Sequence, residues 1–101
     1  MTDAQVEAQK YLDIILSSEI RADLVSLFRK NPGIIDTPEG IARRMGYLPK
    51  VIQSDLDEIT GLGVIGKKKL GNREIYFLNH DRDTEVQQTI GSFLQNLKPT
   101  P

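Results

Sequence analysis

The chain has 101 residues, with 13 Lys and Arg, 14 Asp and Glu, one His and no Cys, and its formal net charge is −1. This length predicts one domain, the 39% of hydrophobic residues exclude a disordered chain, and the lack of Cys excludes disulfides, thiolate metal sites and iron–sulfur clusters. No signal-peptide pattern opens the chain and no apolar run is long enough to span a membrane, so we expect a soluble, cytoplasmic protein without membrane contact.

Two amphipathic helices are predicted before residue 31. Residues 3–16 carry apolar side chains at helical intervals, and Ser17-Ser18 interrupts this pattern and provides an N-cap for a second helix. Asn31-Pro32-Gly33 ends the second helix, because Pro cannot continue the backbone ladder and Gly suits the turn. Ile34-Ile35 then predicts a short extended segment.

A helix-turn-helix is predicted next. Thr37-Pro38-Glu39 combines a Thr cap, a Pro at the first helical position and an acid in the first turn, so a short helix begins there. Gly46 ends it, and after a tight turn Pro49 opens a longer helix that Gly61-Leu62-Gly63 stops. The buried face of the longer helix consists of Ile52, Leu56 and Ile59.

A β-hairpin and a last helix complete the chain. Residues 64–70 and 73–78 predict two strands around Gly71-Asn72, because Gly supplies the positive φ of a two-residue hairpin turn. This register places Lys69 opposite Glu74, a cross-strand charge match. The last helix follows residues 79–81, and the tail is formed by Lys98-Pro99-Thr100-Pro101. The helix carries a stripe of Val86, Ile90, Phe93, Leu94 and Leu97.

These elements predict a mainly α fold with a small β-hairpin, an α+β winged helix-turn-helix with extra N- and C-terminal helices. We expect an N-terminal helix for dimerisation or packing over 1–17, the winged helix-turn-helix over 18–80, and the C-terminal helix and tail over 81–101. The charge follows this division approximately: residues 1–28 carry −3, residues 29–82 carry +3, and residues 83–101 carry −1. A basic middle between acidic ends favours a nucleic-acid partner for the middle segment.

The stretch from Thr37 to Gly46 resembles the first half of the helix-turn-helix of ArsR-type and MarR-type bacterial and archaeal transcription regulators, through the phrase Ile-Ala-x-x-x-Gly. Leu48 to Leu62 with the following Gly63-Val64-Ile65 is similar to their recognition helix and its exit. Residues 73–78 look like their second wing strand. The resemblance covers roughly residues 18–80 and implies sequence-specific binding of double-stranded DNA by a transcriptional regulator.

Candidate DNA-binding residues lie on three of the predicted elements. The outward face of the helix from Pro49 is suited to base and phosphate contacts, the wing places cations near a phosphate backbone, and the preceding helix flanks it. Two alternatives remain open: the lysine run protects a strand edge from aggregation, and the helix face is an ordinary solvent face. The candidates are Lys50, Gln53 and Ser54 on the helix, Lys67, Lys68, Lys69 and Arg73 on the wing, and Arg43 and Arg44 on the preceding helix.

Acidic residues on the presumed recognition helix support a different function. Asp55, Asp57 and Glu58 are repelled by phosphates, although Asp55 fits the margin of the core and Asp57 can accept a hydrogen bond from cytosine. A winged helix that serves as a protein–protein adaptor, with this acidic helix docked on a basic partner, is therefore the alternative function.

Catalysis and metal binding have no pattern of residues in their favour. No nucleophile is placed near a base, so we expect no enzyme activity and no cofactor. His80 lies beside Asp81 and Asp83, but a single His without a spaced His or Cys partner is better explained as a loop or cap residue than as a metal ligand.

The terminal helices and the hairpin carry more apolar residues than a small three-helix core covers. If Tyr76 and Leu78 face the core, Ile75 and Phe77 point the other way and need a cover. The family resemblance implies a homodimer through the terminal helices, and the alternative is packing on their own chain. The expected dimer residues are Tyr11, Ile15, Ile90, Phe93, Leu94 and Leu97. The pattern assigns no operator and no effector ligand.

Overall fold

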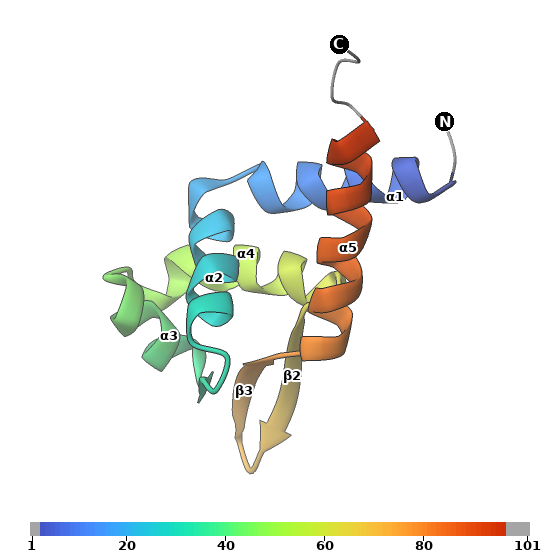
Figure 1. Cartoon of the computed structure of the whole chain (residues 1–101). Helices are drawn as coiled ribbons and strands as arrows, with labels where there is room; N and C mark the ends of the chain where they lie inside the picture. The colour runs from blue at the N-terminus through green and yellow to red at the C-terminus, as the bar shows by residue number, and fades with distance from the viewer. Residues whose placement is uncertain (1–2, 97–101) are drawn as a thin grey trace.

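The computed structural model describes residues 3–96 and confirms the mainly α, winged-helix α+β fold (Figure 1). Two helices precede the helix-turn-helix, a hairpin follows it, and a last helix closes the described part of the chain. The elements are α1 (Asp3–Leu16), α2 (Glu19–Lys30), β1 (Ile35–Asp36), α3 (Pro38–Met45), α4 (Pro49–Gly61), β2 (Ile65–Leu70), β3 (Arg73–Leu78) and α5 (His80–Asn96).

The helix ends follow the predicted capping residues. The Ser18 hydroxyl accepts a hydrogen bond from the Arg21 amide at 3.0 Å, and the Thr37 hydroxyl accepts one from the Gly40 amide at 3.2 Å. Gly46 ends α3 with a φ of 78°, a left-handed conformation that favours glycine. These local signals therefore fix the start of α2 and both ends of α3, and with them the turn that leads into α4.

The sheet is antiparallel with the strand order β1-β3-β2. The predicted hairpin register is confirmed, since Leu70 pairs with Arg73 and Lys69 with Glu74 around Gly71, whose φ is 64°. The ion pair across the hairpin is nevertheless diagonal, because Glu74 Oε1 lies 3.8 Å from the Nζ atom of Lys67. Strand twist brings diagonal neighbours on one face within reach of long side chains.

One apolar core joins the terminal helices to the winged helix. Phe28 of α2, Ile52 of α4 and Tyr76 of β3 are fully buried in it. Tyr11 of α1 and Val86 of α5 belong to the same cluster. The proposed division at residues 17 and 80 stays a prediction.

The outer face of the sheet is partly covered from within the hairpin. Phe77 is half-buried, and its ring lies so close to Gly66 that a Cβ atom there would be 2.5 Å from it. The ammonium of Lys68 lies 5.6 Å from the centroid of the same ring, a cation–π contact. Ile35 pairs with Phe77 on this face and is 65% exposed.

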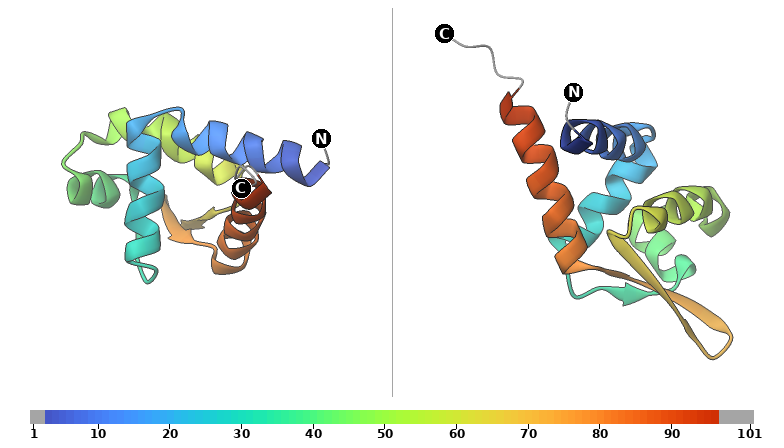
Figure 2. Two further views of the ribbon diagram at one scale, coloured as in Figure 1. Left: turned by 45° about the horizontal axis from the view of Figure 1, so that its top comes forward. Right: turned by 90° about the vertical axis from the view of Figure 1, so that its right-hand side faces the viewer.

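The last helix starts earlier than expected, at His80 rather than after Asp81. The Asn79 side chain accepts a hydrogen bond from the Arg82 amide at 3.1 Å, so Asn79 acts as the N-cap and His80 is the first helical residue. From there α5 runs to α1 and packs against it. Figure 1 and the right-hand view of Figure 2 show the place where these two helices meet on the side of the molecule away from the hairpin tip.

Candidate nucleic-acid interface

The outward face of α4 carries the polar side chains that its helical pattern predicts. Ile52, Leu56 and Ile59 are fully buried on the inner face. Lys50, Ser54 and Asp57 are exposed on the opposite face, and the candidate base-contact residue Gln53 is half-buried at its edge. A helix that buries one face and offers the other is suited to entering a major groove.

Asp55 does not belong to the outward face. Its carboxylate lies 3.1 Å from Arg21 Nε of α2, and both side chains are 13% exposed. The same guanidinium donates to the Ile14 carbonyl at 2.8 Å and to the Ser17 hydroxyl at 2.7 Å. One of the three acids of α4 is therefore neutralised at the margin of the core, while Asp57 and Glu58 remain exposed.

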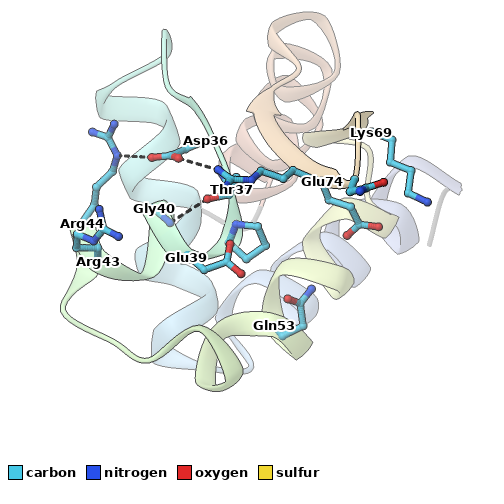
Figure 3. Close-up of a pocket in the computed structure, with 12 residues that line it drawn as sticks. Asp36, Thr37, Glu39, Gly40, Arg43, Arg44, Gln53, Lys69 and Glu74 are labelled. Atoms are coloured by element: carbon cyan, nitrogen blue, oxygen red, sulfur yellow. Dashed lines mark hydrogen bonds and ion pairs between the residues drawn. The ribbon is translucent and has the colours of Figure 1, made fainter.

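A polar hollow of about 1060 Å³ lies between α3, α4 and the tip of the hairpin. Arg43 and Arg44 line it from α3, Lys69 and Arg73 from the hairpin, and Gln53 from α4. Figure 3 shows the α3 arginines on one side of this hollow and Lys69 on the other. The structure thus brings together five of the nine candidate DNA-binding residues.

The cations of the hollow differ in what they contact. Arg44 Nε lies 3.2 Å from Asp36 Oδ2, so that guanidinium is paired. Within the described residues, Arg43, Lys69 and Arg73 form no ion pair. These three cations are free to contact a phosphate backbone.

The wing cations point to both faces of the hairpin, because side chains alternate along a strand. Lys67 and Lys69 share the face that carries Tyr76, and Lys68 shares the opposite face with Phe77. Lys67 is paired with Glu74. Lys69 and Arg73 line the hollow without an ion pair among the described residues, so they are the wing cations best placed to bind phosphate.

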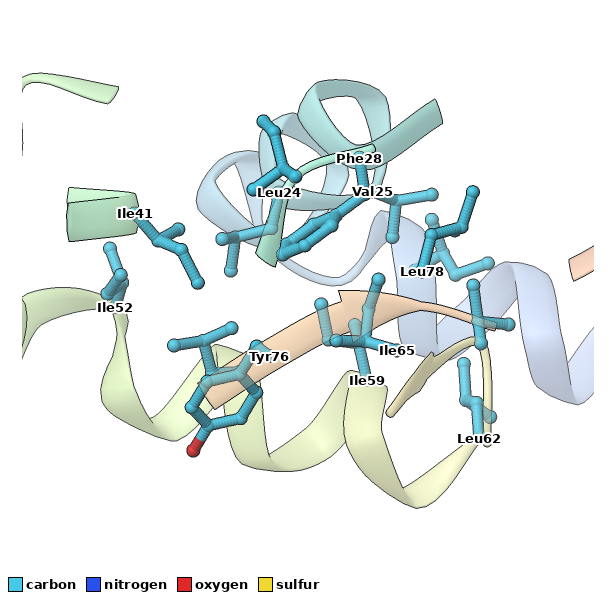
Figure 4. Packing of buried hydrophobic residues seen from close by; sticks show 14 of the residues in the cluster. Leu24, Val25, Phe28, Ile41, Ile52, Ile59, Leu62, Ile65, Tyr76 and Leu78 are labelled. Carbon is cyan, nitrogen blue, oxygen red and sulfur yellow. The ribbon is translucent and has the colours of Figure 1, made fainter. Parts of the chain in front are cut away.

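Two features beside the candidate site escape a reading of the sequence alone. Tyr76 is fully buried, yet its hydroxyl points away from the apolar cluster toward α4 (Figure 4). Burial raises the pKa of this phenol, which therefore keeps its proton. Leu48 and Val51 of the α4 start are 62% and 42% exposed. The predicted register, with Tyr76 opposite Lys67, already indicates that the Tyr76 side chain lies near polar groups. No sequence pattern indicates the exposure of Leu48 and Val51.

The predicted dimer residues are divided between the core and the surface. Tyr11 and Ile15 are 4% and 7% exposed, covered within their own chain. Ile90 and Phe93 of α5 are half-buried and Leu94 is 49% exposed. Leu97 lies outside the described residues. The surface that a second copy can reach is thus on α5 rather than on the inner face of α1.

Polar contacts fasten α5 to the rest of the chain. The buried carboxylate of Asp83 accepts a hydrogen bond from Arg29 Nε of α2 at 2.9 Å. The Arg82 guanidinium lies 5.3 Å from the ring centroid of Tyr11 and donates to its hydroxyl. The Asp83–Arg29 and Arg82–Tyr11 contacts hold α5 in a defined position against α2 and α1.

Within residues 3–96, no three His, Asp or Glu side chains gather in a way that could hold a metal ion. His80 is exposed in the first turn of α5. Among the same residues, no helix has the length and apolar character needed to cross a membrane.

The fold is similar to that of a solved structure, a possible transcriptional regulatory protein (fragment 1–100) from Mycobacterium bovis. The TM-score is 0.64, the sequences are 16% identical, and the match covers 91% of this chain and 99% of the other. No protein-family model matches the sequence. No curated protein matches it either. At this identity the likeness concerns the fold.

Proposed function

We propose that this protein binds double-stranded DNA in a sequence-specific manner and acts as a transcriptional regulator without enzymatic activity. In this proposal α4 enters the major groove and the β2–β3 wing follows the backbone. Kinship with ArsR-type and MarR-type regulators, on the residues of the helix-turn-helix, belongs to the same proposal. The fold neighbour from Mycobacterium bovis, a possible transcriptional regulatory protein, is consistent with this role.

The observation that carries the proposal is the convergence of Arg43, Lys69 and Arg73 on one hollow beside α4. These three cations, without ion pairs among the described residues, come from α3, β2 and β3, and Lys50 is exposed on the adjoining helix face. Cations that neutralise phosphates release counterions, so binding through them weakens with rising salt.

The protein acts as a homodimer in this proposal. Leu94 is 49% exposed on α5, with the half-buried Phe93 and Ile90 beside it. A second copy that covers this surface doubles the basic area and reads a palindromic site, with half-sites about 34 Å apart.

A second candidate function is a winged-helix adaptor that binds another protein instead of DNA. The exposed apolar residues Leu48 and Val51 lie at the start of α4, whose exposed face also carries Asp57 and Glu58. Apolar and acidic groups together fit a basic partner protein. A complex that survives Lys69→Ala and is lost on Asp57→Lys would favour this function.

Selection from random and genomic duplex DNA, with the purified chain at a low and a near-physiological salt concentration, tests the proposal. Regulation through DNA predicts an enriched sequence at both salts and weaker retention of unselected DNA at the higher one. No retained DNA at low salt would reject DNA binding and leave the adaptor function.

A further inference from the structure

The amide of Gln53 lies between two polar groups of its own chain. Its Nε2 atom is 3.2 Å from Oδ1 of Asp57, one helical turn further along α4. The same nitrogen is 3.4 Å from the hydroxyl oxygen of Tyr76 on β3. The Tyr76 hydroxyl in turn donates to Glu74 Oε2 at 3.4 Å. A chain of polar contacts therefore connects the recognition helix to the wing.

The chemistry of these partners fixes the orientation of the amide. A carboxylate only accepts hydrogen bonds, so the group that faces Asp57 has to be the amide nitrogen of Gln53. Tyr76 gives its one proton to Glu74, so its oxygen accepts from Gln53. Both N–H groups of the amide are thereby used within the chain. Among the described residues, no donor is bonded to the Oε1 atom of Gln53.

An amide in this state presents only an acceptor to DNA. The usual glutamine contact with adenine is bidentate and needs one N–H for N7 in addition to the oxygen for N6. Guanine presents only acceptors on its major-groove edge, and thymine an acceptor and a methyl group. Adenine presents its N6 amino donor beside the N7 acceptor, which would face only acceptors here, whereas cytosine presents an N4 amino donor with no acceptor of its own beside it. The neighbouring carboxylate of Asp57, also an acceptor, suits the same amino group.

We propose that Tyr76 and Asp57 hold Gln53 as an acceptor-only group, and that α4 thereby selects cytosine at the base pair that Gln53 meets. The proposal rests on the proposed DNA-binding function and specifies how that site reads sequence. Gln53 touches the base, and Tyr76 is a positioning residue that acts through it from the buried face of the wing.

Removal of the Tyr76 hydroxyl is the direct test. Tyr76→Phe frees one amide N–H and restores the bidentate contact, so the selected base shifts from cytosine to adenine. We expect the wild-type chain to prefer cytosine over adenine at this position by about fivefold or more, and the variant to reverse that order. The variant's affinity for unselected DNA and its salt dependence stay unchanged, because no phosphate contact is lost. The measurement is selection from random duplex DNA, followed by competition between duplexes that differ at that base pair.

Three further variants keep the test decisive. Tyr47→Phe removes a hydroxyl that has no hydrogen-bond partner in the described chain and should select the same bases as wild type. Gln53→Glu, an acceptor only, keeps the cytosine preference at lower overall affinity, whereas Gln53→Met loses it. These two variants decide the matter if Tyr76→Phe does not fold, as judged by its thermal melt.

The outcomes separate this inference from the function on which it rests. If the wild-type chain retains no DNA at low salt, the proposed function itself fails. Two other results would overturn the role of the Gln53 network and leave DNA binding intact. One is DNA binding with the same base preference in wild type and Tyr76→Phe, and the other is loss of the cytosine preference in Gln53→Glu.

Discussion

The guanidinium of Arg21 on α2 lies 3.1 Å from the carboxylate of Asp55 on α4, and both side chains are 13% exposed. This contact withdraws one acid from the exposed face of α4. It also joins α2 to α4. The acids of α4 therefore differ: Asp55 is paired at the margin of the core, and Asp57 and Glu58 are exposed.

We expect Asp55→Ala to lower the free energy of unfolding by about 2 kcal/mol, because it leaves the mostly buried Arg21 guanidinium without its carboxylate. Asp57→Ala, on the exposed face of the same helix, should change it by less than about 0.5 kcal/mol. Urea unfolding of the two variants measures this difference. Equal losses of stability would contradict the division of roles between the two acids.

Glu39 is the acid of the hollow that no ion pair neutralises in the described chain, since Asp36 pairs with Arg44 and Glu74 with Lys67. Glu39→Gln should raise the affinity for duplex DNA at low salt by about three- to tenfold, because it removes a charge that repels phosphate. It should also cost about 0.5 kcal/mol of stability, because an acid in the first turn of α3 interacts favourably with the helix dipole.

Asp13→Asn, on the exposed side of α1, is the matched control for that experiment. It changes the net charge by the same amount and should leave DNA affinity close to that of wild type. A rise in affinity as large as that of Glu39→Gln would show that net charge matters and the hollow does not.

Two glycine substitutions should have opposite effects on stability. Gly66→Ala places a Cβ atom 2.5 Å from the Phe77 ring, so the ring has to leave its place on the sheet, and we expect a loss of about 1–3 kcal/mol. Gly91→Ala meets nothing within 4 Å inside α5 and should stabilise the protein by about 0.5–1 kcal/mol. Thermal or urea unfolding provides the comparison, and a neutral Gly66→Ala would disprove the close packing of Phe77.

Leu94→Lys should convert the proposed dimer to a monomer, because it places a charge on the exposed apolar surface of α5. Gln88→Lys adds the same charge on an exposed position of the helix and should leave the dimer intact. Sedimentation or light scattering reports the molecular mass of each. A wild-type chain that is monomeric at all concentrations would reject the dimer.

Local sequence signals predict most of the fold. Ser18, Thr37 and Gly46 mark helix ends because capping and left-handed turns depend on neighbouring residues alone. The turn at Gly71 likewise determines the pairing of β2 with β3, including Lys69 with Glu74. The ion pair of Glu74 with Lys67 depends on twist and side-chain reach, which the register alone does not specify.

Tertiary packing explains what the pattern leaves open. The apolar stripe predicts that Tyr11 and Ile15 are buried, but it does not say whether the same chain or a second copy buries them. The structure covers both within one chain, through α5 and the central core. The hollow is also unpredictable from spacing, since Arg43 and Arg73 meet there only after the hairpin folds toward α3.

The salt dependence of duplex binding is the most direct test of the central claim, that the hollow and the wing bind DNA. The double variant Lys69→Ala with Arg73→Ala should flatten the slope of log affinity against log salt by about two, and Lys10→Ala on the distant α1 should leave it unchanged. A wild-type chain without measurable binding at low salt, or a double variant with the wild-type slope, would contradict this account.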